Sequence, residues 1–435
     1  MRLKESGRTP KTRKEYVQQP GLLLVGVDVS QAKHSACIGT QTGINCRKLA
    51  FTHCREGFRL FEQTLREHLI THRGRRLLIA MEPSGIYWQG LSERLRSCGD
   101  DVCLVSCQAV HNNRKTMHDG TSKTDEKDAY SVLDLLRQGT FFLPVERDAE
   151  LKAAYRLMRR YMALKKRVSQ LCNQSRAAIH LALPELNPLI TDLTQPTALR
   201  FLQANPTPES VLRNGRQRFL EKWRPRRRCG QWHPEKFQQL YDLTQHSIGL
   251  KDPYRTDEFE IKALALDLAD ALATHQLWLD QALVLLEPRP DFQLLVQLPR
   301  IGAPTAAALL TAMGDIRQYR NGKQLVKLAG LDVRLFESGS SIRRLPKISH
   351  VGSAYLRHWL YHYALRLVAH DPHFRAYSQR RKHQSPGKGA GQRALVAVCD
   401  KLIRMIYRIL TDHAPYDPKK DQSIAAYDAA QRQAA

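Results

Sequence analysis

The order of short apolar runs in the first quarter of the chain constrains the fold more than any other feature of this sequence. Five such runs have the length of strands: 22–29, 36–38, 44–51, 77–81 and 102–105. The first three follow one another through short turns, and a helical pattern precedes each of the last two. Strands that begin as a meander and then alternate with helices predict a mixed α/β sheet covered by helices.

Four carboxylates accompany these predicted elements. Asp28 ends the first strand, Glu82 ends the fourth, and Asp125 and Asp128 lie in a segment that we expect to be helical. Their i, i+3 spacing then puts Asp125 and Asp128 on one helix face, with Glu126 pointing off that face. Any one of the four alone is better explained as a cap or a surface charge. Together, in this order, they predict an RNase H-like domain holding two Mg²⁺ ions about 4 Å apart, with Mn²⁺ as the alternative ion.

The charge of the chain indicates a large polyanionic partner. Sixty-eight Lys and Arg residues against 42 Asp and Glu residues give a net charge of +26, and nucleic acid is the simplest partner for such a protein. Residues 151–230 hold 17 basic and 4 acidic residues, which is +13. The nucleic-acid contacts that we predict in this part of the chain are Arg159, Arg160, Lys165, Lys166, Arg167, Arg224, Arg226, Arg227 and Arg228.

The domain organisation follows from helical periodicity and from the prolines. Long amphipathic patterns at 149–181 and 256–286 predict two helices that pair antiparallel, separated by proline-rich, irregular residues 182–254. We therefore expect five parts. They are a flexible basic arm (1–20), an α/β catalytic domain (21–148), a basic helical connector (149–288), a mainly helical C-terminal domain (289–412) and a disordered tail (413–435).

The compartment is predicted from what the sequence lacks. The nine cysteines form no C-x-x-C pair, which favours reduced thiols in a cytosolic protein. Residues 1–20 show no signal-peptide pattern, and no apolar run approaches the roughly 18 residues that a membrane span needs. We expect a soluble protein of the cytoplasm that is not associated with a membrane.

The start of the C-terminal domain resembles a helix-hairpin-helix turn. Residues 298–306 read Leu-Pro-Arg-Ile-Gly-Ala-Pro-Thr-Ala, a bend whose backbone amides can hold a DNA phosphate. Arg300 stands where the first hairpin glycine usually lies, and Gly302 follows it. A plain helix connection with no phosphate remains an equal alternative.

Two separated sets of motifs resemble one family. The first set is Val25-Gly26-Val27-Asp28-Val29-Ser30, Met81-Glu82-Pro83-Ser84-Gly85-Ile86-Tyr87 and Lys123-Thr124-Asp125 with Asp128-Ala129. The second set is Leu298 to Ala306, Leu328-Ala329-Gly330-Leu331, Ser338-Gly339, Lys347-Ile348-Ser349, Gly352 through Arg357, and Gly387-Lys388. Both sets are similar to those of the DEDD transposases of the insertion sequence one-hundred-ten family.

The resemblance implies a RuvC-like domain with Asp28, Glu82, Asp125 and Asp128, a coiled-coil connector, and a transposase domain with a nucleophilic serine. In that family the serine attacks a DNA phosphate beside a partner subunit's metals, giving a covalent phosphoserine. A structured bridge RNA pairs with the element ends and the target in double-stranded DNA. The resemblance therefore implies DNA, guide RNA and other copies of the chain as partners, in a dimer or a tetramer. It also implies a bacterial protein associated with the nucleoid.

Ser338 is the serine that the resemblance selects. It lies in a loop, 337–344, with Ser340 and Ser341, which remain alternatives. A serine hydroxyl needs a base or a metal for activation, and no histidine lies in this loop, so the metal site is the simpler activator. Basic residues around the loop are predicted phosphate contacts: Arg343, Arg344, Lys347 and Arg357. His358 and His362, four residues apart, are better explained by a packed or DNA-facing helix than by a metal.

Three functions stay open on this reasoning. The leading one is an RNA-guided transposase or recombinase that cuts and rejoins DNA. A metal-dependent nuclease for Holliday-type junctions would use the carboxylates without the serine. A non-catalytic nucleic-acid-binding protein would retain only the RNase H-like shell.

Overall fold

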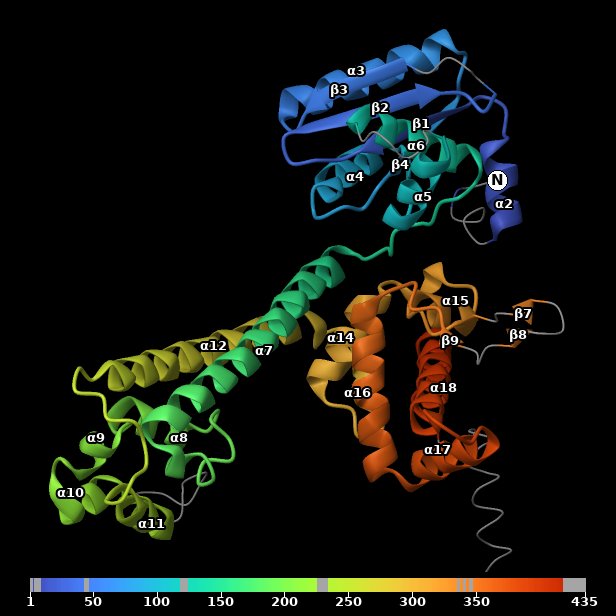
Figure 1. The fold of residues 1–435 in the computed structure, drawn as a ribbon. Coiled ribbons are helices and arrows are strands. Elements are labelled where there is room, and N and C mark those ends of the chain that lie inside the picture. Colours follow the sequence, from blue (N-terminus) through green and yellow to red (C-terminus); the bar gives the residue numbers. More distant parts are fainter. Residues whose placement is uncertain are drawn as a thin grey trace, which may run out of the picture. The chain divides into compact units, whose positions relative to one another are not determined.

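The computed structural model describes residues 3, 9–42, 47–117, 124–224, 234–334, 337–338, 342–343 and 347–417. The chain divides into two compact units, 1–146 and 147–435, and Figure 1 shows the elements of each. None of the described helices combines the length and the apolar character that crossing a membrane requires.

The first unit is built on a five-stranded mixed sheet with the order β3-β2-β1-β4-β5. Its strands are β1 Leu22–Asp28, β2 Lys33–Gly39, β3 Arg47–Thr52, β4 Arg76–Met81 and β5 Asp101–Leu104. β1, β2 and β3 pair antiparallel, whereas β4 pairs parallel with both β1 and β5. This confirms the predicted mixed α/β sheet.

Helices cover both faces of this sheet, because the central strands bury side chains on both sides. The helices are α2 Pro10–Val17, α3 Arg55–Thr71, α4 Trp88–Ser97, α5 Cys107–Met117 and α6 Asp125–Arg137. Alternate residues of β1 enter two cores, one shared with α2, α5 and α6 and the other with α3 and α4. Gly26 lets α6 approach closely, since a Cβ there would lie 2.4 Å from the Leu133 amide nitrogen.

The predicted flexible arm over 1–20 is wrong for the residues that form α2. Thr9 caps this helix, and Tyr16 and Val17 are buried. The Tyr16 hydroxyl donates to the Asp101 carboxylate at 2.6 Å. Two apolar side chains and one long-range hydrogen bond anchor a segment that its basic composition made look solvated. Residues 1, 2 and 4–8 lie outside the described residues.

The second unit begins with the predicted helical hairpin. α7 Ala149–Ala182 and α12 Thr256–Leu286 lie side by side along their lengths (Figure 1). Leu151 of α7 shares a core with Leu286 of α12, whereas Ile179 shares another with Ile261. The start of one helix therefore packs on the end of the other, which confirms the antiparallel pairing.

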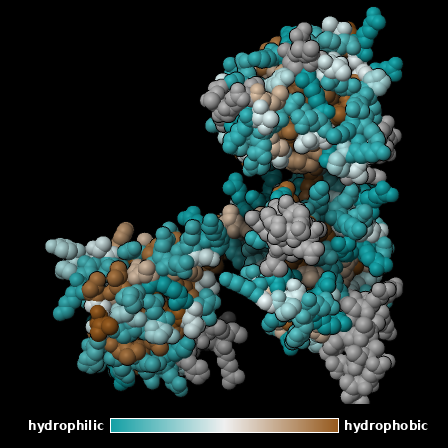
Figure 2. Space-filling view, turned by 45° about the vertical axis from the view of Figure 1, so that its right-hand side comes forward, coloured by the Kyte–Doolittle hydropathy of each residue, from teal (hydrophilic) through white to brown (hydrophobic). Residues whose placement is uncertain are grey.

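Residues between these helices form short helices rather than irregular structure. They are η1 Pro184–Leu186, α8 Pro196–Ala204, α9 Pro208–Leu212, α10 Gly215–Lys222 and α11 Pro234–Thr244. Prolines stand at or next to the first residue of several of them, where the missing amide costs no hydrogen bond. A core of Phe201, Phe219 and Phe237 holds them together. Hydrophobic surface is visible on this part at the lower left of Figure 2.

The C-terminal part is mainly helical. Its helices are α13 Pro290–Val296, α14 Ala303–Met313, η2 Ile316–Gln318, α15 Gly322–Leu328, α16 Ala354–His370, α17 Pro372–Gln384 and α18 Ala390–Asp412. Four two-residue strands, β6 Val333–Arg334, β7 Glu337–Ser338, β8 Ile342–Arg343 and β9 Lys347–Ile348, form two small ladders. Within the predicted tail 413–435, Tyr416 packs against the core of this part, and 418–435 lie outside the described residues.

Candidate functional site

Two of the predicted carboxylates follow neighbouring strands at one edge of the sheet. Val27 of β1 is the partner of Met81 in the parallel strand β4. Asp28 and Glu82 come next in each chain segment, and parallel strands end at the same edge. The Ser84 hydroxyl donates to the Val29 carbonyl oxygen at 3.4 Å, which links the two segments beyond the strands.

The first turn of α6 brings the other two carboxylates to this edge. The opposite end of α6 is fixed where Arg137 Nε donates to the Thr40 carbonyl oxygen at 3.0 Å, beyond the end of β2. Since β2 runs antiparallel to β1, α6 begins near the end of β1, where Asp28 stands. Asp125 is the first residue of α6 and Asp128 lies one turn along.

Asp128 already has a cationic partner. Its side chain is 6% exposed and accepts from Arg114 Nη1 at 2.6 Å. Across the described part of the chain, no group of three or more His, Cys, Asp or Glu side chains is close enough to hold a metal. The elements that carry the four carboxylates thus meet at one edge of the sheet, but the described side chains do not form a metal-holding group there, and Asp128 is paired with an arginine.

α5 contributes two residues that sequence reasoning missed. One is Arg114, the partner of Asp128. The other is Cys107, whose thiol has its pKa raised to about 11 by burial and by the hydrogen bond and negative charge of Glu82. A protonated thiol is thus a donor to Glu82. The only sequence signal was that α5 follows β5, whose end lies at the same edge of the parallel strands.

The predicted serine lies in a two-residue strand. Ser338 of β7 is opposite Ile342 of β8, and Glu337 is opposite Arg343. Ser340, Ser341 and Arg344 lie outside the described residues, as do the side chains of Ser338 and Arg343. The structure thus describes the backbone pairing of this segment and leaves the choice among the three serines as a prediction.

Comparison with known families matches both units. A family model described as a transposase of the DEDD and IS110 type matches residues 25–184. A second, described as the transposase IS116/IS110/IS902 family, matches residues 292–379. The chain belongs to the IS110 family of transposases. The predicted family resemblance is confirmed.

Curated relatives agree with this family. The chain is 28% identical over 148 residues to the pilin gene-inverting proteins of Moraxella lacunata and Moraxella bovis, which covers 33% of this chain and 44% of each relative. It is 24% identical over 311 residues to an uncharacterized 43.6 kDa protein of insertion element IS110 from Streptomyces coelicolor, over 71% of this chain and 75% of the relative. The chain thus spans less than half the length of the gene-inverting relatives that it matches.

A DEDD domain of the IS110 type implies the use of a divalent metal. The four carboxylates are suitable ligands for such a metal, because hard divalent cations prefer carboxylate oxygens. They also fit in place, because Asp28 and Glu82 end adjacent parallel strands beside the start of α6. The ion pair of Asp128 with Arg114 would have to rearrange, and the carboxylates would have to converge, since the described side chains do not form a metal-holding group.

The predicted hairpin turn connects α13 to α14. Arg300 has a φ of 56°, the left-handed conformation that the usual glycine adopts readily. Gly302 caps α14, and its carbonyl oxygen accepts from the Ala306 amide. From α16, the Tyr363 hydroxyl donates to the Pro299 carbonyl oxygen at 2.9 Å. The arginine at the glycine position thus keeps the backbone of the turn, and α16 braces it.

The other predicted nucleic-acid contacts are dispersed over the second unit. Arg160, Lys166, Arg167, Arg224 and Lys347 are exposed. Arg357 is half-buried and donates to the Ala329 carbonyl oxygen at 2.8 Å, so it supports the structure locally. Arg226, Arg227 and Arg228 lie outside the described residues. Arg159 and Lys165 of α7 lie over aromatic rings of α16, with the Arg159 Cζ 5.3 Å from the Tyr355 centroid.

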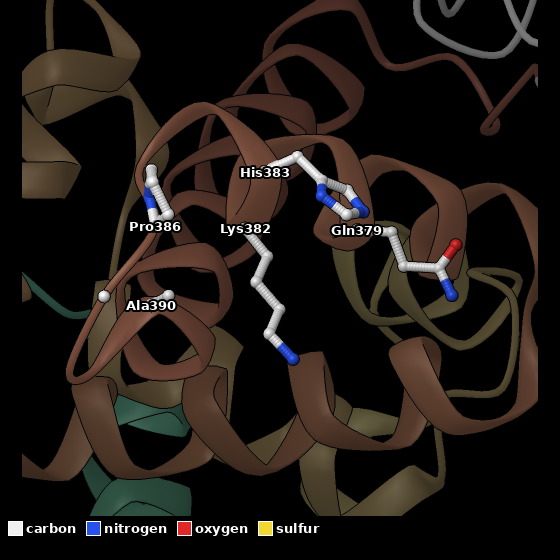
Figure 3. A pocket seen from close by; sticks show the side chains of 6 residues that line it. Gln379, Lys382, His383, Pro386 and Ala390 are labelled. Carbon is white, nitrogen blue, oxygen red and sulfur yellow. The ribbon is translucent and has the colours of Figure 1, made fainter.

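A cavity of about 540 Å³ lies between α17 and the start of α18. Figure 3 shows Gln379, Lys382 and His383 from the last turns of α17, with Pro386 and Ala390 from the following segment. Its lining contains no carboxylate. The lining of this cavity therefore differs in chemistry from the sheet edge that carries the carboxylates.

Proposed function

We propose that this protein is a DNA recombinase that cuts and rejoins the DNA of a mobile element. The shared edge of Asp28 and Glu82, set by the register of β1 and β4, is the observation that carries the proposal. Both family models are described as transposases, and two relatives are named for gene inversion. Inversion and insertion of a DNA segment both require strands to be cut and rejoined.

The acidic edge would hold the divalent ions. In this proposal Asp28, Glu82, Asp125 and Asp128 supply the oxygen ligands for Mg²⁺, with Mn²⁺ as the alternative. Such ions stabilise negative charge on a phosphate under attack and favour ionisation of a bound hydroxyl. Cys107 would orient Glu82 through its hydrogen bond, as second partners of metal ligands commonly do. Arg114 would hold Asp128 in place until the metal binds, when their ion pair would rearrange.

Ser338 would supply the nucleophile. Its hydroxyl oxygen attacks the phosphorus of a DNA phosphodiester, forming an O–P bond and losing its proton, while the bond from phosphorus to one deoxyribose oxygen breaks and that oxygen gains a proton. The match of Ser338-Gly339 to the family motif supports this choice over Ser340 and Ser341. The covalent bond conserves the energy of the phosphodiester for rejoining.

RNA guidance and self-association complete the proposal. A structured RNA would pair with element ends and target DNA, and the basic residues of 151–230 would hold its backbone by shape rather than by base sequence. A second copy of the chain would bring its acidic edge to Ser338, in a dimer or in a tetramer with both DNA partners. The family resemblance supports both statements.

Capture of a protein–DNA adduct tests the proposal. Full-length protein, candidate element-end DNA labelled at one end and the RNA transcribed beside the gene are incubated with Mg²⁺, then denatured and digested with protease. We expect labelled DNA carrying a short peptide in the wild type and none in Ser338→Ala. Asp28→Asn should also abolish the adduct while RNA binding stays near wild type.

The same assay separates the alternatives. Cleaved ends without an attached peptide, retained in Ser338→Ala, would overturn the serine chemistry and favour the nuclease. Protein that binds both nucleic acids but leaves the DNA intact would favour the non-catalytic binder. Loss of both cleavage and RNA binding in Asp28→Asn would show that the carboxylates are structural.

A further inference from the structure

A cluster of cationic and imidazole side chains lies where α7, α12 and α16 meet. Lys165 of α7 has its ammonium 5.7 Å from the centroid of Trp359 in α16. His358 adjoins this tryptophan, and its ring centroid lies 4.3 Å from that of His362, one helical turn further. From α12, His275 stacks on Tyr161 of α7 with centroids 4.0 Å apart. We name Lys165, His358, His362 and His275 the α16 histidine cluster.

The aromatic rings give this cluster a fixed base. The Tyr161 ring stacks on His275, and its centroid lies 6.3 Å from that of Trp359. Trp359 is only 5% exposed. Lys165 and His362 are exposed and His358 is half-buried, so the cluster combines an ordered aromatic floor with cationic groups that solvent and ligands can reach.

Lys165, His358 and His362 have no acidic partner among the residues that the structure describes, since none of them forms an ion pair with a carboxylate there. Burial lowers the pKa of all three histidines, the charge of Lys165 lowers each of them further, and His362 also lowers that of His358. The Nε2 atom of His275 is buried with no hydrogen-bond partner among the described residues. An anion is the partner that this cluster lacks.

We propose that the α16 histidine cluster binds a phosphodiester of nucleic acid, with Lys165 as the permanent cation and His358 and His362 as cations that gain their protons when the phosphate binds. The proposal rests on the proposed function only in taking nucleic acid as the partner. A phosphodiester fits because it is singly charged, accepts several hydrogen bonds and belongs to a polymer that the other exposed basic residues of α7 would also attract. Imidazolium and ammonium groups both donate to phosphate oxygens.

The pH dependence follows from linkage. In the free protein Lys165 disfavours protonation of both histidines, and His362 also disfavours protonation of His358. A bound phosphate favours protonation and raises both pKa values. Because the bound state then carries more protons, binding tightens as pH falls through and below the ordinary histidine value of about 6.5.

Equilibrium binding across pH tests this proposal. Full-length protein is titrated with a labelled 20-base-pair duplex and, separately, with a labelled RNA hairpin, at pH 8.0 and 5.8 and at several salt concentrations. We compare His358→Gln/His362→Gln with His370→Gln, a matched change on an exposed histidine at the end of the same helix. Thermal unfolding of each variant at both pH values confirms that the fold is retained.

We expect the wild type and His370→Gln to show a steeper dependence of log K on log salt at pH 5.8. The slope should steepen by about 0.9 for each histidine that pairs with a duplex phosphate. The double variant should lose this increment and keep its affinity at pH 8.0. Lys165→Gln should lower the slope by about 1 at both pH values. The nucleic acid that shows the increment, DNA or RNA, is the one the cluster holds.

An unchanged pH increment in the folded double variant would overturn the proposal for both nucleic acids. Equal loss of the increment in His370→Gln would do the same, because it would show a general effect of helix charge. Failure of the adduct assay leaves this binding measurement unaffected, so the two proposals fail independently. Loss of affinity at pH 8.0 alone would assign the histidines to packing rather than to phosphate.

Discussion

The acidic edge of the first unit, which carries Asp28, Glu82, Asp125 and Asp128, differs from the α16 histidine cluster of the second unit in how its charges are paired. Around the acidic edge, charged side chains have partners within the same unit: Asp128 pairs with Arg114, and Glu126 pairs with Lys48. In the α16 histidine cluster, Lys165 stands among histidines whose protonation it disfavours. The charged side chains named for the first region pair within their own unit, whereas we propose an external phosphodiester as the partner of the second.

Paired charges keep a site in place, whereas unpaired charges are available to bind a substrate. A carboxylate that has a partner before a metal arrives keeps its place without the metal, because an unpaired buried charge is costly. Cationic side chains without acidic partners bind nucleic acid more tightly, because they neutralise phosphates and release the counterions held there. Under the proposed function, the first unit supplies the acidic edge, whereas the second supplies the Ser338 nucleophile and the basic groups that bind nucleic acid.

The largest effect should come from Glu82→Gln. This change removes one negative charge at the acidic edge and alters little volume, so DNA cleavage should fall by more than about a hundredfold. Affinity for DNA and RNA should stay within about twofold, because the basic contacts lie in the second unit. Parallel cleavage and binding titrations measure both. A matched fall in binding would break the division of roles between the units.

Arg114→Ala should give the next largest effect. It leaves the Asp128 carboxylate, 6% exposed, without its partner, and breaking a buried pair costs about 3 kcal/mol in free energy of unfolding. Mg²⁺ should restore part of this loss if Asp128 is a metal ligand. Urea unfolding with Mg²⁺ and with EDTA measures it. The same loss in both solutions would contradict metal binding by Asp128.

Gly26→Ala tests the packing that brings α6 to the edge. The added Cβ would lie 2.4 Å from the Leu133 amide nitrogen, and overpacking of this kind costs about 1–3 kcal/mol. Gly90→Ala is the control, since its Cβ would meet nothing within 4 Å. Equal unfolding midpoints for the two variants would mean that α6 does not lie on β1 as described.

Lys48→Gln should have the smallest effect. Its ion pair with Glu126 joins two side chains that are 59% and 62% exposed, and exposed pairs contribute little. The melting temperature and the cleavage rate should stay at wild-type values. A marked loss of cleavage would give Glu126 a role at the acidic edge and would revise the assignment of Asp125 and Asp128.

Local pattern explains what could be predicted from the sequence. Apolar runs around Asp28 and Glu82 read directly as strands, and the 3.6-residue period of α7 and α12 extends over many turns. Arg114 and Cys107 escaped prediction because their roles depend on where α5 packs, which no local period encodes. Tyr16 escaped for the same reason, since its partner Asp101 lies 85 residues away. Long-range packing set these positions.

Mass spectrometry of the DNA-linked peptide tests the central claim most directly. After reaction with Mg²⁺, protease digestion and nuclease trimming, the account predicts a nucleotide on the peptide that contains Ser338, in the wild type and not in Glu82→Gln. That result would join the acidic edge and the serine in one reaction. A nucleotide attached to any other residue, or cleaved DNA with no attached peptide, would contradict it.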